Sequence, residues 1–260
     1  MPRQRIVITG ASRGIGEALA LEYAGPGIAL VLIGRDRARL DAIAAECRAA
    51  GAEAEAVVLD IRDRTAMAEG MCRLDEAGPV DLLIANAGIQ KPTHDDPGEV
   101  ASSFEEIETN FLGTLNTVVP MVARMAARRS GQIAVVSSLA GYVPLPDTPG
   151  YCSSKAGLTV WGLALRARLR PVGVKVSVVC PGYIAGGMGP RNKGRQPFLV
   201  PLDETAAKIR GGLARNKAVV AFPRPVAWVA RTTQLLPEWI SRLTQRSSRV
   251  RIDGGNERTS

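Results

Sequence analysis

The sequence predicts an α/β fold, a doubly wound parallel β-sheet of about seven strands with helices on both faces. Short apolar runs alternate with longer helical patterns along the chain. The runs are apolar at almost every position, which is typical of parallel strands buried on both faces. With 260 residues, 46% of them hydrophobic, the chain can bury one large core. The expected strands are 5–9, 28–33, 55–59, 81–85, 132–137, 175–179 and 217–223, and the expected helices are 17–23, 37–50, 65–76, 100–128 and 151–168.

The first expected strand leads into the stretch TGASRGIG and then into a helix. Gly10, Gly14 and Gly16 let the backbone turn sharply and approach a pyrophosphate. The N-terminus of the following helix offers free N–H groups and a partial positive charge. A glycine-rich turn alone is a weak signal, and a turn without a ligand is the alternative. The strand before it and the helix after it favour a dinucleotide site.

The end of the second strand is where such a site chooses between NAD and NADP. A carboxylate there would bind the ribose 2′-OH, whereas Arg35 can accommodate a 2′-phosphate. Arg13 could add a second positive charge and Ser12 a hydrogen bond. The sequence therefore favours NADP(H) over NAD(H). Asp36 weakens this preference if the register differs by one residue, and its alternative role is the N-cap of the next helix.

Polar residues also follow the third and fourth strands. Asp60 is placed to meet the adenine, and Asn86, Ala87 and Gly88 close the fourth strand. Ligands of open α/β sheets bind at the carboxyl ends of the strands. Both groups could instead form ordinary turns, where Asp, Asn and Gly are favoured for local reasons. Their position favours the site.

A possible proton-transfer set follows the fifth strand. Ser138 precedes Tyr151 by thirteen residues, and Lys155 lies four residues further on, on the same helix face. Hydride reduction of a ketone leaves an alkoxide that needs a proton. A tyrosine hydroxyl can supply it, but its usual pKa of about 10 makes it a poor base for the reverse step. A lysine nearby can lower that pKa, and a serine hydroxyl can polarise the carbonyl.

Each of these three residues also has an ordinary structural interpretation. Tyr151 could be a buried aromatic at a helix start, Ser138 a helix cap and Lys155 a solvated surface charge. The spacing of all three favours the catalytic interpretation.

Together, TGASRGIG, NAG, Asn110, Ser138, the pattern Tyr151-Cys-Ser-Ser-Lys155 and Pro181-Gly182 resemble the short-chain dehydrogenase/reductase family, in its smaller single-domain branch. The resemblance covers residues 5 to about 185. It implies a Rossmann-type domain that uses NAD(H) or NADP(H) to interconvert carbonyl and alcohol groups. It further implies a homodimer or homotetramer.

By motif position, the resemblance implies that Tyr151 is the acid/base and Lys155 its activator. Ser138 would orient the substrate, and Asn110 would support a water-linked proton relay. The residues expected to contact the cofactor are Gly10, Ser12, Arg13, Gly14, Ile15, Gly16, Arg35, Asp60, Ile61, Asn86, Ala87, Gly88, Tyr151, Lys155, Pro181, Gly182 and Ile184.

The chain departs from the family pattern after the sixth strand. Family members commonly place a cofactor-contacting threonine at the position of Gly186. The segment of about 183–202 is rich in Gly, Pro and basic residues, as expected of a mobile substrate lid. We take 217–223 as the seventh strand. The IDGG at 252–255 resembles the usual family ending, and we interpret it as a coincidence.

Three regions are therefore expected: a catalytic domain over 1–224, basic amphipathic helices over 225–246, and a flexible tail over 247–260. Pro237 is expected to start the second of these helices. The apolar stripe of 225–246 could pack within the molecule, cover a subunit interface or flank the substrate mouth. It could equally rest on an anionic membrane surface.

Composition restricts the remaining function classes. Residues 191–260 hold 14 Lys and Arg against 5 Asp and Glu, so the net charge of +8 belongs to the C-terminal quarter. No aromatic platform is interleaved with these charges, so no nucleic-acid partner is expected. The four cysteines form no CxxC pair, and the only histidine, His94, lies in a polar loop, so no metal site is expected.

The location expected from the sequence is cytoplasmic, with peripheral membrane contact as an alternative. No signal-peptide pattern opens the chain, and no apolar run reaches the roughly 18 residues of a membrane-spanning helix.

The sequence thus predicts an NADP(H)-dependent oxidoreductase that interconverts a carbonyl and a secondary alcohol. The rival hypothesis is a nucleotide-binding regulatory or scaffold protein of the same fold without turnover. The substrate stays open among 3-oxoacyl chains, steroid-like or other lipid ketones, sugars and polyols. The direction of the reaction is also open.

Overall fold

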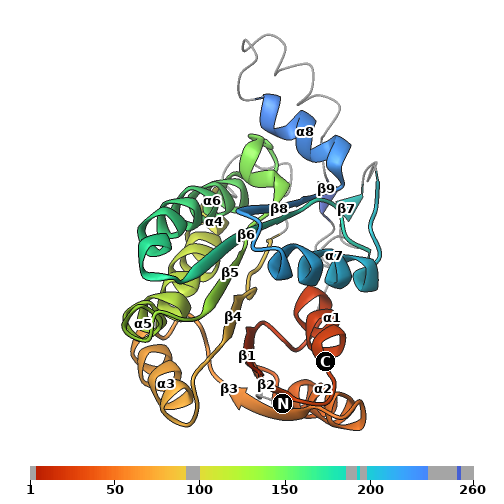
Figure 1. The fold of residues 1–260 in the computed structure, drawn as a ribbon. Coiled ribbons are helices and arrows are strands. Elements are labelled where there is room, and N and C mark those ends of the chain that lie inside the picture. The colour runs from red at the N-terminus through yellow and green to blue at the C-terminus, as the bar shows by residue number, and fades with distance from the viewer. Residues whose placement is uncertain (1–3, 92–99, 186–191, 194–197, 234–250, 253–260) are drawn as a thin grey trace.

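The computed structural model describes residues 4–91, 100–185, 192–193, 198–233 and 251–252. Its centre is a parallel sheet of seven strands in the order β3-β2-β1-β4-β5-β6-β8 (Figure 1). The predicted α/β fold class is therefore confirmed. The strands are β1 (Gln4–Thr9), β2 (Ile28–Gly34), β3 (Glu53–Val58), β4 (Leu82–Ala85), β5 (Gln132–Val136), β6 (Lys175–Pro181) and β8 (Val219–Phe222).

Helices cover both faces of this sheet (Figure 1). The apolar faces of α1, α2 and α7 pack on one side, and those of α3, α5 and α6 pack on the other. The helical segments are α1 (Gly14–Tyr23), α2 (Arg37–Ala49), α3 (Arg64–Glu76), α4 (Ser102–Glu106), the π-helix η2 (Ile107–Leu112), α5 (Gly113–Ala127), the 3₁₀ turn η3 (Leu139–Tyr142), α6 (Pro149–Leu169), the 3₁₀ turn η4 (Arg170–Val172), α7 (Leu202–Ala214) and α8 (Arg224–Thr233).

The register of the strands aligns their carboxyl ends. Thr9 lies beside Ile33, Gly34 beside Val58, and Val136 beside Val179. The residues that follow these strands therefore meet along one edge. The strand order runs outward in both directions from β1 and β4, and the crevice beside such a reversal is where open α/β sheets bind ligands.

The segment 100–128, expected as one helix, is built from three pieces. The π-helix η2 separates α4 from α5. A π-helix inserts an extra residue into the turn, and such turns occur frequently at functional sites. No periodicity of apolar residues signals this widening, and Asn110 lies within it.

The C-terminal region is described only in part. Of the helices expected over 225–246, the structure describes α8, while Pro237 lies outside the described residues. β8 lies where the seventh strand was predicted. The two-residue strands β7 (Asn192–Lys193) and β9 (Arg251–Ile252) pair antiparallel, so a short strand occurs within the segment expected to be a flexible tail. Within the described parts of the chain, no helix is both long and apolar enough to cross a membrane.

Candidate functional site

The glycine turn between β1 and α1 forms the first wall of the site. Gly10 and Gly14 have φ of +67° and +61°, a region that side chains rarely adopt. A Cβ on Gly16 would lie 2.2 Å from the carbonyl oxygen of Gly10. The backbone is therefore folded too tightly for any other residue. α1 begins at Gly14, directly after this turn, so its first N–H groups face the crevice end of the sheet.

Asn86 fastens this turn to the end of β4. Its Nδ2 donates to the carbonyl oxygens of Thr9 at 3.0 Å and Gly10 at 3.3 Å. In return, the hydroxyl oxygen of Thr9 accepts from the N–H groups of Asn86 and Ala87. The structure thus brings together the two motifs TGASRGIG and NAG, which are far apart in the sequence.

This turn fits the pyrophosphate of a dinucleotide. Its backbone leaves no space for a Cβ at Gly10 or Gly16, and it leads directly into a helix N-terminus. The N–H of Ala11 donates to the carbonyl oxygen of Ile33, which holds the turn against the end of β2. Ile15 lies one residue inside α1 and is half-buried against the core.

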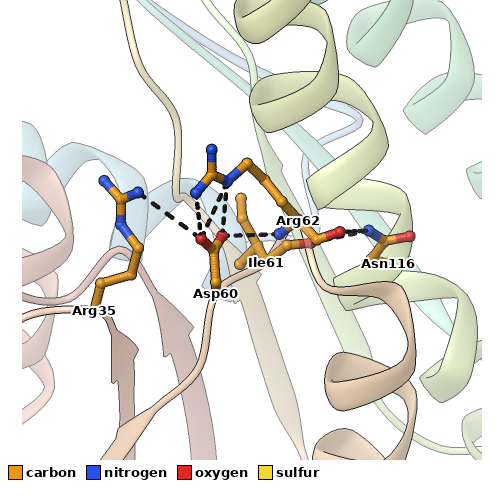
Figure 2. Close-up of polar contacts among 5 residues, drawn as sticks. All are labelled: Arg35, Asp60, Ile61, Arg62 and Asn116. Atoms are coloured by element: carbon orange, nitrogen blue, oxygen red, sulfur yellow. Dashed lines mark hydrogen bonds and ion pairs between the residues drawn. The ribbon is translucent and has the colours of Figure 1, made fainter.

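Three charged side chains lie close together after the ends of β2 and β3 (Figure 2). Arg35 is exposed over 64% of its side chain, and its Nη1 lies 3.8 Å from Oδ2 of Asp60. Arg62 binds the same carboxylate more closely, with Nη2 at 2.7 Å from Oδ2. The hydrogen bonds of Arg62 are the main reason why the pKa of Asp60 lies below its usual value, and the charge of Arg35 adds to this.

Neighbouring residues of the nucleotide-choice region have local roles. The side chain of Asp36 accepts from the N–H of Arg39 and caps α2, as its alternative interpretation predicted. The hydroxyl oxygen of Ser12 lies 3.6 Å from the position a Cβ would take on Gly34. Arg13 is exposed at the N-cap of α1. Ser12 and the end of β2 are therefore adjacent.

Ser138 and Tyr151 meet at the carboxyl end of β5. Ser138 caps η3 by accepting from the N–H of Ala140, and its hydroxyl donates to the carbonyl oxygen of Pro181 at 3.4 Å. Tyr151 lies in the first turn of α6, and its ring is buried. Burial raises the pKa of Tyr151 to about 12, against the lowering effect of its side-chain hydrogen bond with Ser138.

Lys155 lies one turn further along α6 and only 2% of it is exposed. Its Nζ donates to the carbonyl oxygen of Val136 at 3.0 Å and lies 5.6 Å from the centre of the Tyr151 ring. Burial lowers the pKa of Lys155 to about 8. The expected lowering of the tyrosine pKa by Lys155 is not seen in this geometry, because loss of hydration dominates the phenol and the ammonium points to a backbone carbonyl.

Asn110 is fully buried in η2 and holds the chain that leaves β4. Its Oδ1 accepts from the N–H of Ile89 at 2.7 Å, and its Nδ2 donates to the carbonyl oxygen of Ile89 at 2.9 Å. A Cβ on Gly88 would lie 3.0 Å from Oδ1 of Asn110 and 3.4 Å from Nζ of Lys155. The glycine of the NAG motif therefore lets these two side chains approach.

Glu106 is a site neighbour that the sequence did not reveal. It is buried, four residues before Asn110, and its Oε1 accepts from the N–H of Lys91. Its Oε2 lies against the start of α6, 2.6 Å from the position a Cβ would take on Gly150. Burial raises the pKa of Glu106, while the nearby N–H groups of Lys91 and Tyr151 lower it. The N–H of Tyr151 acts only through its proximity, because Oε2 of Glu106 accepts no hydrogen bond. Only the tertiary fold reveals this carboxylate.

The end of β6 closes the site from the other side. Pro181 pairs with Phe222, and the N–H of Gly182 donates to the carbonyl oxygen of Phe222. Ile184 forms a bridge to Val200 and is buried in the core. The two ends of the expected lid are thus paired with each other. Gly186 and His94 lie outside the described residues.

The two cysteines near the site are packing residues. Cys152 and Cys180 are buried and unpaired, and burial raises the pKa of both thiols. Among the residues that the structure describes, no group of three metal-ligating side chains occurs.

Comparison with known proteins agrees with this architecture. A family model described as short chain dehydrogenase matches residues 4–196. An uncharacterized oxidoreductase of Myxococcus xanthus is 35% identical over 240 residues, which cover 91% of this chain and 94% of that protein. Human 17-beta-hydroxysteroid dehydrogenase 13 is 28% identical over 257 residues, with 95% and 84% covered. A solved short-chain dehydrogenase from Sphingobium yanoikuyae in complex with NADPH has a TM-score of 0.76 at 27% identity, with 98% and 100% covered.

The chain therefore belongs to the short-chain dehydrogenase family, and the predicted family is confirmed. It is an oxidoreductase that acts on CH–OH groups, in a family that binds NAD(P). Members of this family typically act on small molecules and often form oligomers.

Proposed function

We propose that this protein interconverts a carbonyl and a secondary alcohol with NADP(H), and that Tyr151 is the general acid/base. The observation that carries the proposal is the meeting of Ser138 and Tyr151 at the carboxyl end of β5, on the same sheet edge as the glycine turn. A regulatory protein without turnover would have no need to bury a hydrogen-bonded phenol and an ammonium there.

The bound nicotinamide would supply or accept the hydride. Ser138 would donate a hydrogen bond to the substrate oxygen, and Tyr151 would give that oxygen its proton during reduction. A phenol with a pKa of about 12 is protonated at neutral pH, so it is ready for this step. In the oxidation direction the phenolate must form, and the positive charge of Lys155 would stabilise it. Asn110 would hold the β4 exit and support proton exchange with solvent.

The cofactor residues would divide between two parts of the nucleotide. The N–H groups of the glycine turn, including those of Gly14, Ile15 and Gly16, would hold the pyrophosphate. Arg35, together with Arg13 and Ser12, would hold the 2′-phosphate that distinguishes NADP from NAD. The exposed guanidinium of Arg35 supports this preference, as does the NADPH in the Sphingobium structure.

The remaining cofactor positions are assigned by their place at the crevice. Asp60 and Ile61, which follow β3, would lie on the adenine side. Asn86, Ala87 and Gly88, at the end of β4, would lie beside the ribose. Pro181, Gly182 and Ile184, at and after the end of β6, would lie on the nicotinamide side.

We propose a hydrophobic ketone as the substrate class. The support is the human relative, whose name describes a hydroxysteroid dehydrogenase, at 28% identity over almost the whole chain. Sugars and polyols are then the weaker candidates. A panel of a steroid ketone, a 3-oxoacyl thioester and a ketose separates these classes.

The cofactor assignment is tested by titrating the purified protein with NADPH and NADH while following cofactor fluorescence. We expect wild type to bind NADPH at least about tenfold more tightly, because an arginine pairs well with a phosphate. Arg35→Glu should remove this preference, and Arg37→Glu, on the adjacent helix turn, should keep it. Equal binding of both cofactors by wild type would contradict the assignment.

We also propose contacts beyond the active site, namely a homo-oligomer and peripheral contact of α8 with an anionic membrane. On α8, Trp228 is 71% exposed and the side chains of Arg224 and Arg231 are exposed as well. A basic helix with an exposed aromatic residue suits such a surface. Co-sedimentation with anionic vesicles but not zwitterionic ones, lost in Trp228→Glu, is the expected result. Equal co-sedimentation of wild type and Trp228→Glu with anionic vesicles would contradict the membrane contact.

A further inference from the structure

Asp60 lies between two arginines from different strand ends (Figure 2). Arg62 contacts its carboxylate through both Nε and Nη2, at 2.7 to 3.2 Å. The backbone N–H of Arg62 also donates to Oδ1 at 3.0 Å. Arg35, by contrast, approaches only Oδ2, at 3.8 Å, which is an ion pair without a hydrogen bond. The carboxylate is therefore held by Arg62, and Arg35 is held loosely.

The turn that carries Arg62 is fixed by its neighbours. Asn116, on α5, donates from Nδ2 to the carbonyl oxygen of Ile61 at 2.9 Å and to that of Arg62 at 3.4 Å. The N–H of Asp63 donates to the carbonyl oxygen of Asp60, and the Asp63 side chain caps α3. The Arg62 backbone cannot shift without breaking these contacts. The turn thus holds Arg62 beside Asp60, and the hydrogen bonds to the carboxylate orient its guanidinium.

The charges explain why this matters for a phosphate at Arg35. The carboxylate of Asp60, a few ångströms away, competes with the phosphate for the guanidinium of Arg35. It also repels the negative charge of the phosphate. Such interactions between charges about 4 Å apart are several times stronger near a protein surface than in bulk water. A hydrogen-bonded guanidinium on Asp60 offsets most of this repulsion.

We propose that Arg62 determines the cofactor preference by occupying Asp60, which leaves the guanidinium of Arg35 available for the 2′-phosphate of NADP. This inference rests on the proposed function, because it requires that the cofactor be NADP(H). Arg62 acts through Asp60 and Arg35, so it is a positioning residue and need not touch the nucleotide. In its absence, Asp60 would turn to Arg35 and hold it as a closed ion pair.

The test is the dissociation constants of NADPH and NADH for wild type, Arg62→Ala, Asp60→Asn and the double variant Asp60→Asn/Arg62→Ala. Arg62→Ala should weaken NADPH binding about tenfold and leave NADH binding within about twofold, because NADH has no 2′-phosphate. The double variant should bind NADPH within about threefold of Asp60→Asn, because no carboxylate remains to capture Arg35. Arg64→Ala, which removes an exposed charge two residues away, is the control for a general loss of positive potential.

The outcomes separate this inference from the function on which it rests. If wild type binds NADPH and NADH equally, the cofactor part of the proposed function fails first. If wild type prefers NADPH and Arg62→Ala keeps that preference, only the role of Arg62 is overturned. Equal weakening of both cofactors without recovery in the double variant would show a purely structural role and would also overturn it. Circular dichroism of each variant confirms folding before titration.

Discussion

Lys155 carries a buried ammonium group, and burial disfavours its charged form. It lies among the largest fully buried side chains, and its pKa is lowered to about 8 by burial. Its Nζ donates a hydrogen bond to a neutral group, the carbonyl oxygen of Val136. A charge buried with so little compensation is costly to the fold, which is expected of a residue retained for chemistry.

This predicts a specific pH dependence of stability. Because the pKa of Lys155 is about 8 when folded and 10.5 when exposed, the unfolded state binds the proton more tightly between these values. The free energy of unfolding therefore rises with pH in this window. Between pH 7 and 9.5, wild type should gain about 1 to 2 kcal/mol relative to Lys155→Met in urea denaturation. If the free energies of unfolding of wild type and Lys155→Met changed in parallel with pH, the lowered pKa of Lys155 would be contradicted.

At the residue scale, motif spacing alone predicted that Ser138, Tyr151 and Lys155 lie together. Spacing works here because each residue follows a strand end or lies one helix turn from the next. Glu106 and Arg62 could not be found in this way, since a carboxylate on a helix and an arginine in a turn are ordinary at the surface. Glu106 contacts Lys91 only because the tertiary fold brings them together. Arg62 binds Asp60, for which the sequence suggested a different partner, the adenine.

The N-terminal turn of α6 is the element on which the site depends, because it carries Tyr151. Gly150 packs there against α4, where a Cβ would lie 2.4 Å from Cα of Ser103 and 2.6 Å from Oε2 of Glu106. These are a backbone atom and a buried carboxylate, so neither can move cheaply. The close approach of two helices therefore fixes the position of the turn that carries Tyr151.

Gly150→Ala should therefore displace α6 from α4. We expect a loss of about 1 to 3 kcal/mol in the free energy of unfolding, the usual cost of overpacking, together with a fall in kcat. Gly211→Ala on α7 is the matched control, since its Cβ would meet only the end of the Arg215 side chain, at 3.3 Å. That variant should gain up to about 1 kcal/mol from helix propensity. Equal stability of both variants, measured by urea denaturation, would contradict the packing argument.

At the element scale, periodicity predicted the strands to within a few residues, and β8 was placed correctly despite the unusual C-terminus. The segment 100–128 shows the limit. Its apolar pattern fits one helix, but η2 widens a turn at Asn110 so that one amide can hold both the N–H and the carbonyl oxygen of Ile89. Such a turn is stabilised by contacts from outside the helix, which local sequence does not encode.

At the scale of the whole molecule, the candidate site residues lie along one edge of the seven-stranded sheet. The parallel register brings the carboxyl ends of β1 to β6 to the same side of the sheet. The glycine turn after β1, the charged residues after β2 and β3, and Ser138 after β5 therefore lie along one edge. This arrangement could be predicted from the sequence. The surface of α8 could be predicted only as an amphipathic pattern, because a pattern does not specify what the apolar face contacts.

The measurement that tests the central claim most directly is kcat for reduction of a hydrophobic ketone by NADPH in Tyr151→Phe, with Kd for NADPH measured in parallel. Tyr23→Phe, which changes another buried phenol at the C-terminal end of α1, is the control. We predict that Tyr151→Phe lowers kcat at least about 100-fold, the usual contribution of a general acid, while its Kd for NADPH stays within about threefold of wild type and Tyr23→Phe keeps its activity. A Tyr151→Phe protein that binds NADPH and reduces the ketone at the wild-type rate would contradict the account.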